Sequence, residues 1–220
     1  MTLTVPLDDG RAACLDTIDA FVRAVDALSE YELLGASRCH GWSRLDVVVH
    51  VIGGWQSMLG GLVSSVDSEP TVDAASYWSA FVVEYATDDP VPELMSQRRR
   101  SMAYARPASA TAQLRDVAAA LRRGVLALGE SPRARQGHIF APGDYLAVWA
   151  VEVVVHHLDL LSDEPPPPGA LALARATVEA LVDEPLPSSW TDLDVTLIGT
   201  GRQPAPAWPG SATVRFPVFD

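Results

Sequence analysis

The chain has 220 residues, and its 28 acidic residues outnumber 16 basic residues to give a formal net charge of −12. All the basic residues are arginine, so the chain lacks the lysine amine that Schiff-base chemistry and a phosphate-binding P-loop require. An acidic chain is repelled by phosphate backbones and anionic lipid surfaces, which disfavours nucleic acid and membranes as partners.

Other features of the composition indicate an intracellular globular protein. Hydrophobic residues make up 48% of the chain, and no apolar run reaches the roughly 18 residues that a transmembrane helix needs. Cys14 and Cys39 form neither a metal-binding pair nor a disulfide framework. We therefore expect a cytoplasmic protein. For Cys39 two interpretations remain open, a reactive thiol or an unreactive loop cysteine.

The first three-quarters of the sequence predicts helices. Apolar residues recur every three or four positions in the segments 7–30, 43–66, 111–128 and 145–161. Ser43 and Asp46 have capping-box spacing at the start of the second segment. Pro142-Gly143-Asp144 predicts a break followed by a helix N-cap.

The regions between these helices are less regular. The segment 73–86 also has a helical repeat, and the Pro- and Arg-rich stretch after it predicts a broken helix and a loop.

The composition changes after about residue 164. Pro165 to Pro168 form an unbroken proline run, which predicts a stiff spacer. The segment 170–182 then predicts a helix, and 193–198 and 213–218 predict strands. The fold class is therefore mainly α, with a four-helix bundle over residues 1–164 and a small α+β C-terminal domain over residues 165–220.

The helix predicted at 145–161 carries the most informative polar residues. Glu152, His156 and Asp159 fall within roughly 60° of one another around a helix, whereas His157 points away. A Glu and a His at positions i and i+4 can reach one metal ion, and a carboxylate in this apolar run is costly to bury without a partner. The alternative is a polar stripe that faces water.

A further ligand is available on the helix predicted at 43–66. His50 shares its face with small or polar residues that include Asp46 and Gly54. Each of Gly53 and Gly54 costs a helix interior about 1 kcal/mol relative to alanine, which indicates close approach of another helix or of a ligand. Asp46, one turn before His50, is either an orienting partner of its ring or only a helix cap.

Two motifs resemble a known family. The segment from Arg38 to Gly54 resembles the loop and helix of the DinB-like metalloprotein superfamily, and within it the actinobacterial branch of mycothiol-dependent maleylpyruvate isomerases. The later Glu-x-x-x-His of that branch is matched by Glu152 and His156. The resemblance implies a DinB-like bundle in which His50, Glu152 and His156 bind a divalent metal, with zinc as the first choice.

The resemblance also implies a reaction. A His2Glu set leaves a fourth zinc position open, and the family is thought to bind the thiol of mycothiol there. Such a protein is an isomerase or a thiol transferase that acts on small electrophiles. Asp159 lies close to His156 as a possible orienting partner. The family's isomerase also holds its anionic substrate with a C-terminal arginine, for which Arg202 is a candidate here.

Two alternatives to an enzyme stay open. One is a non-catalytic metal-binding or regulatory module, and the other is a structural bundle whose polar stripe is solvated. The sequence leaves a monomer and a homodimer equally possible.

Overall fold

The structure is a computed structural model that describes residues 1–85, 89–208 and 214–219. The first half of the chain contributes α1 (Leu7–Asp26), α2 (Glu30–Leu33), α3 (Arg44–Val63), α4 (Ser76–Tyr85), α5 (Val91–Met102) and α6 (Pro107–Leu126). The second half contributes β1 (Arg133–Arg135), β2 (His138–Phe140), α7 (Pro142–Asp159), α8 (Pro168–Val182) and α9 (Asp192–Gly199). Among the described residues, none of the helices combines the length and the apolar character that crossing a membrane requires.

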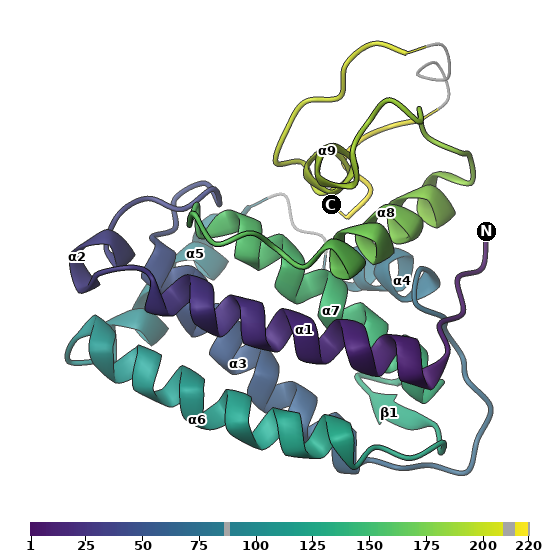
Figure 1. The fold of residues 1–220 in the computed structure, drawn as a ribbon, viewed down its shortest axis with the longest axis horizontal. Helices are drawn as coiled ribbons and strands as arrows, with labels where there is room; N and C mark the ends of the chain where they lie inside the picture. The colour runs from purple at the N-terminus through teal and green to yellow at the C-terminus, as the bar shows by residue number, and fades with distance from the viewer. Residues whose placement is uncertain (86–88, 209–213, 220) are drawn as a thin grey trace.

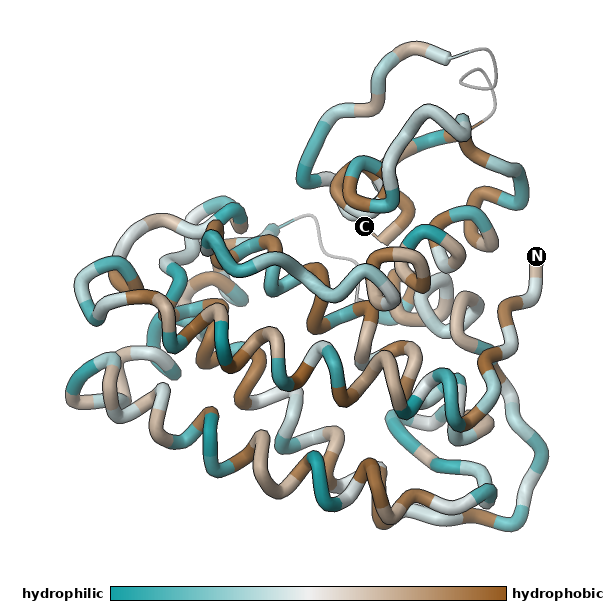
Figure 2. Tube along the Cα trace, in the orientation of Figure 1, coloured by the Kyte–Doolittle hydropathy of each residue, from teal (hydrophilic) through white to brown (hydrophobic). Residues whose placement is uncertain are grey.

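Four long helices form the bundle. Helix α1 packs against α6 and α7, and α3 packs against the same two helices from the other side, which closes a four-membered ring (Figure 1). Hydrophobic and hydrophilic residues alternate along α1 and α6 with the helical repeat, so each helix turns an apolar face inward (Figure 2). The predicted fold class, a mainly helical bundle, is confirmed.

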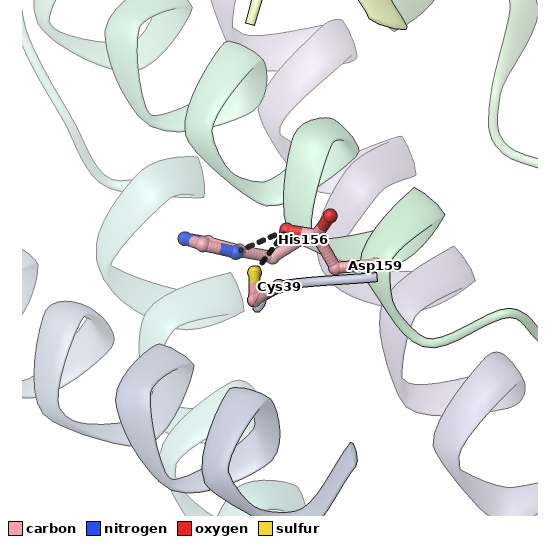
Figure 3. A group of neighbouring side chains, drawn as sticks. All are labelled: Cys39, His156 and Asp159. Carbon is pink, nitrogen blue, oxygen red and sulfur yellow. Dashed lines mark hydrogen bonds and ion pairs between the residues drawn. The ribbon is translucent and has the colours of Figure 1, made fainter. Parts of the chain in front are cut away.

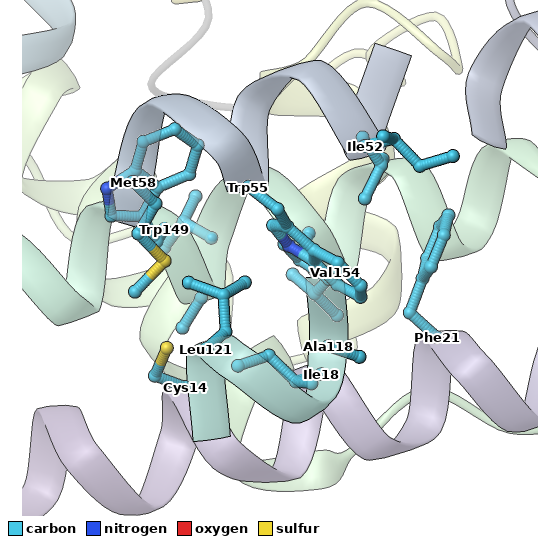
Figure 4. Packing of buried hydrophobic residues seen from close by; sticks show 14 of the residues in the cluster. Cys14, Ile18, Phe21, Ile52, Trp55, Met58, Ala118, Leu121, Trp149 and Val154 are labelled. Carbon is cyan, nitrogen blue, oxygen red and sulfur yellow. The ribbon is translucent and has the colours of Figure 1, made fainter. Parts of the chain in front are cut away.

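Large side chains fill the centre of this ring. Phe21 of α1 meets Trp55 of α3 edge to face with ring centroids 5.7 Å apart, and Trp149 of α7 is also fully buried (Figure 4). Aromatic pairs of this kind stabilise a core beyond the area they bury. The core thus holds α3 and α7, the two helices that carry the candidate ligands, in fixed positions.

The structure confirms one predicted helix start and corrects another. Ser43 and Asp46 form the capping box of α3, with Asp46 accepting hydrogen bonds from the backbone N–H and the hydroxyl of Ser43. Helix α7, however, begins at Pro142 with Ala141 as its N-cap residue. Asp144 is therefore not a cap; it lies inside the first turn, where its buried carboxylate accepts a hydrogen bond from the backbone N–H of Val5.

The C-terminal region is more helical than predicted. Residues 193–198 belong to α9, not to a strand, because Thr191 and Asp194 form a capping box that starts a helix. Residues 214–218 contain no strand, and Thr213 lies outside the described residues. The alternating pattern in 193–198 was misleading, since the residues from Val195 to Gly199 are all buried and the apolar ones among them need no single face.

Helix α8 joins the bundle to the C-terminal region. Its Ala170 and Ala174 belong to the main core, whereas Val178 packs with Leu186 and Val195 in a second small cluster. Pro168 starts the helix, so only the first three prolines form an extended connection. The boundary at residues 164 and 165 stays a prediction.

A short hairpin precedes α7 and was not predicted. In the antiparallel pair of β1 and β2, Arg135 faces His138 across a two-residue turn. Gln136 and Gly137 both have positive φ, 49° and 77°, as the hairpin turn of type I′ requires. The stretch after α4 contains a continuous helix, α5, in place of the predicted broken helix and loop.

Candidate metal centre

Helices α3 and α7 bring three predicted ligands together. His50, Glu152 and His156 each offer a ligand atom, and these atoms lie within 4.8 Å of one another. His50 Nε2 is 3.8 Å from Glu152 Oε1, and the two imidazole rings meet edge to face with centroids 4.8 Å apart. Two imidazoles and one carboxylate at this separation fit the donor set of a catalytic zinc site.

The group is partly accessible from solvent. The side chains of His50, Glu152 and His156 retain 28%, 23% and 12% exposure, respectively. A Cβ added to Gly54 would lie 3.6 Å from Glu152 Oε1 and 3.2 Å from the Trp149 ring. Gly54 thus lets α3 approach Trp149 and Glu152 of α7 closely, whereas a Cβ at Gly53 would meet no atom within 4 Å.

The ring of His156 is oriented by a neighbouring carboxylate. His156 Nδ1 lies 3.0 Å from Asp159 Oδ2 and, because a carboxylate only accepts, Nδ1 carries the proton. The other ring nitrogen points away from Asp159 and keeps its lone pair (Figure 3). Burial lowers the pKa of His156 despite the hydrogen bond to Asp159, so the ring is neutral near pH 7, as a metal ligand must be.

Asp159 lies at the centre of a second cluster of side chains. Its carboxylate is fully buried and accepts hydrogen bonds from Arg202 Nε at 3.1 Å and Arg202 Nη2 at 2.9 Å. The Cys39 thiol donates to the same carboxylate at 3.1 Å (Figure 3). Despite its burial, His156 and Arg202 hold the pKa of Asp159 far below its ordinary value. Asp159 therefore does not belong to a water-facing stripe.

Ligand atoms of Cys39, His156 and Asp159 also lie close enough together to bind one metal ion. Burial and the Asp159 charge, however, raise the pKa of Cys39 to about 12, so its sulfur remains a thiol. Both oxygens of Asp159 are already engaged by Arg202. This group is thus a hydrogen-bonded cluster that supports His156, and it favours the interpretation of Cys39 as an unreactive loop cysteine.

The surroundings of His50 and Glu152 are aromatic and positively charged. The Trp42 ring contacts the His50 ring, with the two centroids 5.2 Å apart and the rings tilted by 55°. Burial opposes ionisation of Glu152, but His50, His156 and Arg135 together lower its pKa below the ordinary value. Glu152 is therefore negatively charged before any metal binds. This negative charge favours binding of a divalent metal ion.

The structure places the remaining predicted residues as follows. The carboxylate of Asp46 is taken up by the capping box, and among the described residues no hydrogen bond joins it to His50. The capping alternative therefore explains Asp46. His157 points away from the group, as predicted, and its Nε2 lies 2.8 Å from the carbonyl oxygen of Glu164.

Sequence reasoning missed two neighbours of the site. Neither Trp42 nor Arg135 was among the predicted site residues. The available signal for Arg135 was the Gln136-Gly137 pair, which favours a two-residue hairpin but is weak without alternating apolar residues around it.

The protein is a four-helix bundle with two histidines and one glutamate on facing helices. It thus falls in the class of helical-bundle proteins whose candidate metal ligands lie between the helices. The chain belongs to the family described as mycothiol maleylpyruvate isomerase N-terminal domain, whose model matches residues 14–161. This confirms the resemblance seen in the sequence.

Two crystal structures share the fold. One is of a mycothiol-dependent maleylpyruvate isomerase, with 14% identity and a TM-score of 0.55. The other is of a histidine-to-alanine mutant of such an isomerase, with 13% identity and a TM-score of 0.54. Each similarity covers 79% of this chain and 70% of the other. None of the curated proteins matches the sequence.

Proposed function

We propose that the protein binds a divalent metal ion through His50, Glu152 and His156, and that this ion is zinc. We further propose that it uses mycothiol, a low-molecular-weight thiol, to isomerise or modify small electrophiles. The observation that carries the proposal is the convergence of these three donor atoms within 4.8 Å, in a chain whose residues 14–161 match the family. We place this activity in the cytoplasm, where Cys14 and Cys39 stay unpaired.

The chain's own residues prepare the site for such an ion. Asp159 holds the proton on His156 Nδ1, which leaves the other nitrogen free to bind. Glu152 supplies the negative charge, and the ring of Trp42 packs against that of His50. A bound divalent metal lowers the pKa of a coordinating thiol and so favours its nucleophilic form at neutral pH.

The three-residue ligand set also bears on the class of function. Structural zinc sites are usually closed by four protein ligands, whereas three ligands and an open position are typical of catalytic sites. The described residues near the group offer no fourth ligand in the same cluster. This favours an enzyme over a metal-binding module without catalysis.

The first test is the metal content of the purified protein, measured by inductively coupled plasma mass spectrometry. We expect about one equivalent of divalent metal per chain. His50→Ala and Glu152→Gln should each reduce it at least tenfold, because each removes one of three ligands.

His40→Ala is the matched control, since His40 is exposed in the loop before α3 and lies outside the group. It should keep the metal. Metal-free wild-type protein, even after incubation with zinc, would refute the proposal. Metal-loaded protein that transfers mycothiol to no electrophile with an activated double bond would instead support the non-catalytic module.

A further inference from the structure

One face of α7 carries a row of functional side chains. Trp149, Glu152, His156 and Asp159 follow one another at spacings of three and four residues, so they lie on successive turns of one helix face. An arginine contacts each end of this row. Arg135 lies over the Trp149 ring, with its guanidinium carbon 4.3 Å from the ring centroid, and Arg202 binds Asp159.

The two arginines differ in their partners. The Arg202 guanidinium donates two hydrogen bonds to the buried carboxylate of Asp159 and a third to the backbone carbonyl of Thr200. Its charge is therefore neutralised within the protein. An arginine in this state holds the structure together and has little capacity left for a substrate anion.

Arg135 differs in its partners. Its Nη1 donates to the hydroxyl of Tyr77, but its buried Nε has no hydrogen-bond partner among the residues that the structure describes. Among the described residues, no carboxylate oxygen lies within 4.0 Å of its guanidinium. Arg135 thus keeps a buried donor without a partner, although its charge acts on Glu152 from a distance. A carboxylate is the group that a guanidinium binds best.

The hairpin fixes the position of Arg135. It is the last residue of β1, directly before the Gln136-Gly137 turn. Gln136 holds a positive φ of 49°, an unfavourable conformation for this residue, and its side-chain oxygen accepts a hydrogen bond from the Tyr77 hydroxyl at 3.1 Å. Buried Phe140 anchors β2 against Tyr77, with ring centroids 5.2 Å apart.

The charges around Arg135 favour an anion. A divalent ion held by one carboxylate and two neutral imidazoles keeps a net positive charge. Trp149, on which Arg135 stacks, is one helical turn from Glu152, and the charge of Arg135 lowers the pKa of Glu152. A substrate anion between Arg135 and the bound ion would therefore meet positive charge from two directions.

We propose that Arg135 is the residue that binds the carboxylate of an anionic substrate, next to the metal centre. This inference rests on the proposed function for the identity of the neighbouring ion. It assigns substrate recognition to the hairpin before α7, while Arg202 acts as a positioning residue through Asp159.

The test uses maleate as a simple dicarboxylate probe and its uncharged diamide as the comparison, with binding measured by isothermal titration calorimetry. We expect the zinc-loaded wild-type protein to bind maleate and to bind the diamide at least tenfold more weakly. Arg135→Gln should weaken maleate binding at least tenfold, because it removes a charge-assisted pair of hydrogen bonds. Arg135→Lys keeps the positive charge but not the planar pair of N–H donors. Its affinity for maleate should lie between that of the wild type and that of Arg135→Gln.

Arg123→Gln is the matched control, since it removes the same charge from an exposed position on α6. It should bind maleate as the wild type does. Arg135→Gln protein that is folded by circular dichroism and binds maleate with wild-type affinity would overturn the inference. So would a wild-type protein that fails to distinguish maleate from the diamide.

The metal content of the same samples separates this inference from the proposed function. Arg135→Gln should retain the wild-type amount of metal, because Arg135 is not a ligand. If the wild type holds no metal, the proposed function fails, yet the loss of maleate binding in Arg135→Gln still tests the role of Arg135.

Discussion

Asp159 links the candidate metal centre to the C-terminal region through individual hydrogen bonds. It receives the Nδ1 proton of His156 on one side and the guanidinium of Arg202 on the other. Burial lowers the pKa of His156, and the positive charge of Arg202 lowers it further. Asp159 can therefore orient the His156 ring through a hydrogen bond while the ring stays neutral. The neutral, oriented ring is the form that binds a metal.

The role of Asp159 predicts a loss of metal affinity in Asp159→Asn. The amide can no longer hold the His156 proton as firmly, and loss of such an outer partner lowers metal affinity by about 10- to 100-fold. Competition with a chromophoric zinc chelator measures this change.

Asp163→Asn, at an exposed position after α7, is the control and should leave the affinity unchanged. An Asp159→Asn protein that is folded and binds zinc as tightly as the wild type would show that His156 needs no orienting carboxylate.

Helix α7 brings most of the site together, and its first turn depends on a buried acid. The carboxyl of Asp144 is buried, which raises its pKa from 3.8 to about 6. Its hydrogen bond from Val5 lowers the pKa but does not offset the burial. This contact ties the residues before α1 to the start of α7.

Asp144 predicts a pH-dependent stability. A carboxyl with a raised pKa in the folded state contributes its full stability below pH 3.8, and this contribution is lost as the pH rises through about 6. Asp144→Asn keeps an acceptor for Val5 but does not ionise. As the pH rises from 4 to 7, the free energy of unfolding of the wild type should therefore fall by about 2 kcal/mol relative to that of the variant.

Urea denaturation at several pH values measures this difference. Asp116→Asn, at an exposed position on α6, controls for the loss of one acidic group. Parallel stability profiles for the wild type and Asp144→Asn would show that burial of Asp144 has no energetic effect.

At the scale of the whole molecule, the C-terminal segment completes the site. Arg202 follows α9 and reaches Asp159 at the end of α7, 43 residues away in the sequence. Helix α8 packs against α7, and α9 packs against α8, so that α9 lies above the bundle in the view of Figure 1. The ion pair is therefore also a contact between the C-terminal region and the bundle.

A double-mutant cycle tests this contact. Arg202→Gln leaves the buried Asp159 carboxylate without its strongest partner and should lower the free energy of unfolding by about 3 kcal/mol. In the Asp159→Asn background the same change should cost at least about 1 kcal/mol less, because no charge is left unpaired. Chemical denaturation at pH 7 gives the four values, and strictly additive losses would refute the coupling.

Much of the bundle could be predicted because it depends on local rules. The helical repeat located α1, α3, α6 and α7, and the Ser43–Asp46 spacing placed the start of α3. The same rules failed at residues 193–198, where a capping box and burial on all sides outweighed an alternating pattern. The weak hairpin signal at Gln136-Gly137 also escaped detection.

The sequence by itself determined the grouping of Glu152, His156 and Asp159, because 3.6 residues per turn place them on one face of any helix. It also supplied the family resemblance that pointed to His50. Only the tertiary structure decided that His50 reaches this group, that Asp46 is a cap and that Arg202 pairs with Asp159. It also decided that the Arg135 Nε has no hydrogen-bond partner among the described residues. The reason is physical: contacts within a helix follow from its geometry, whereas contacts between distant segments depend on how the whole core packs.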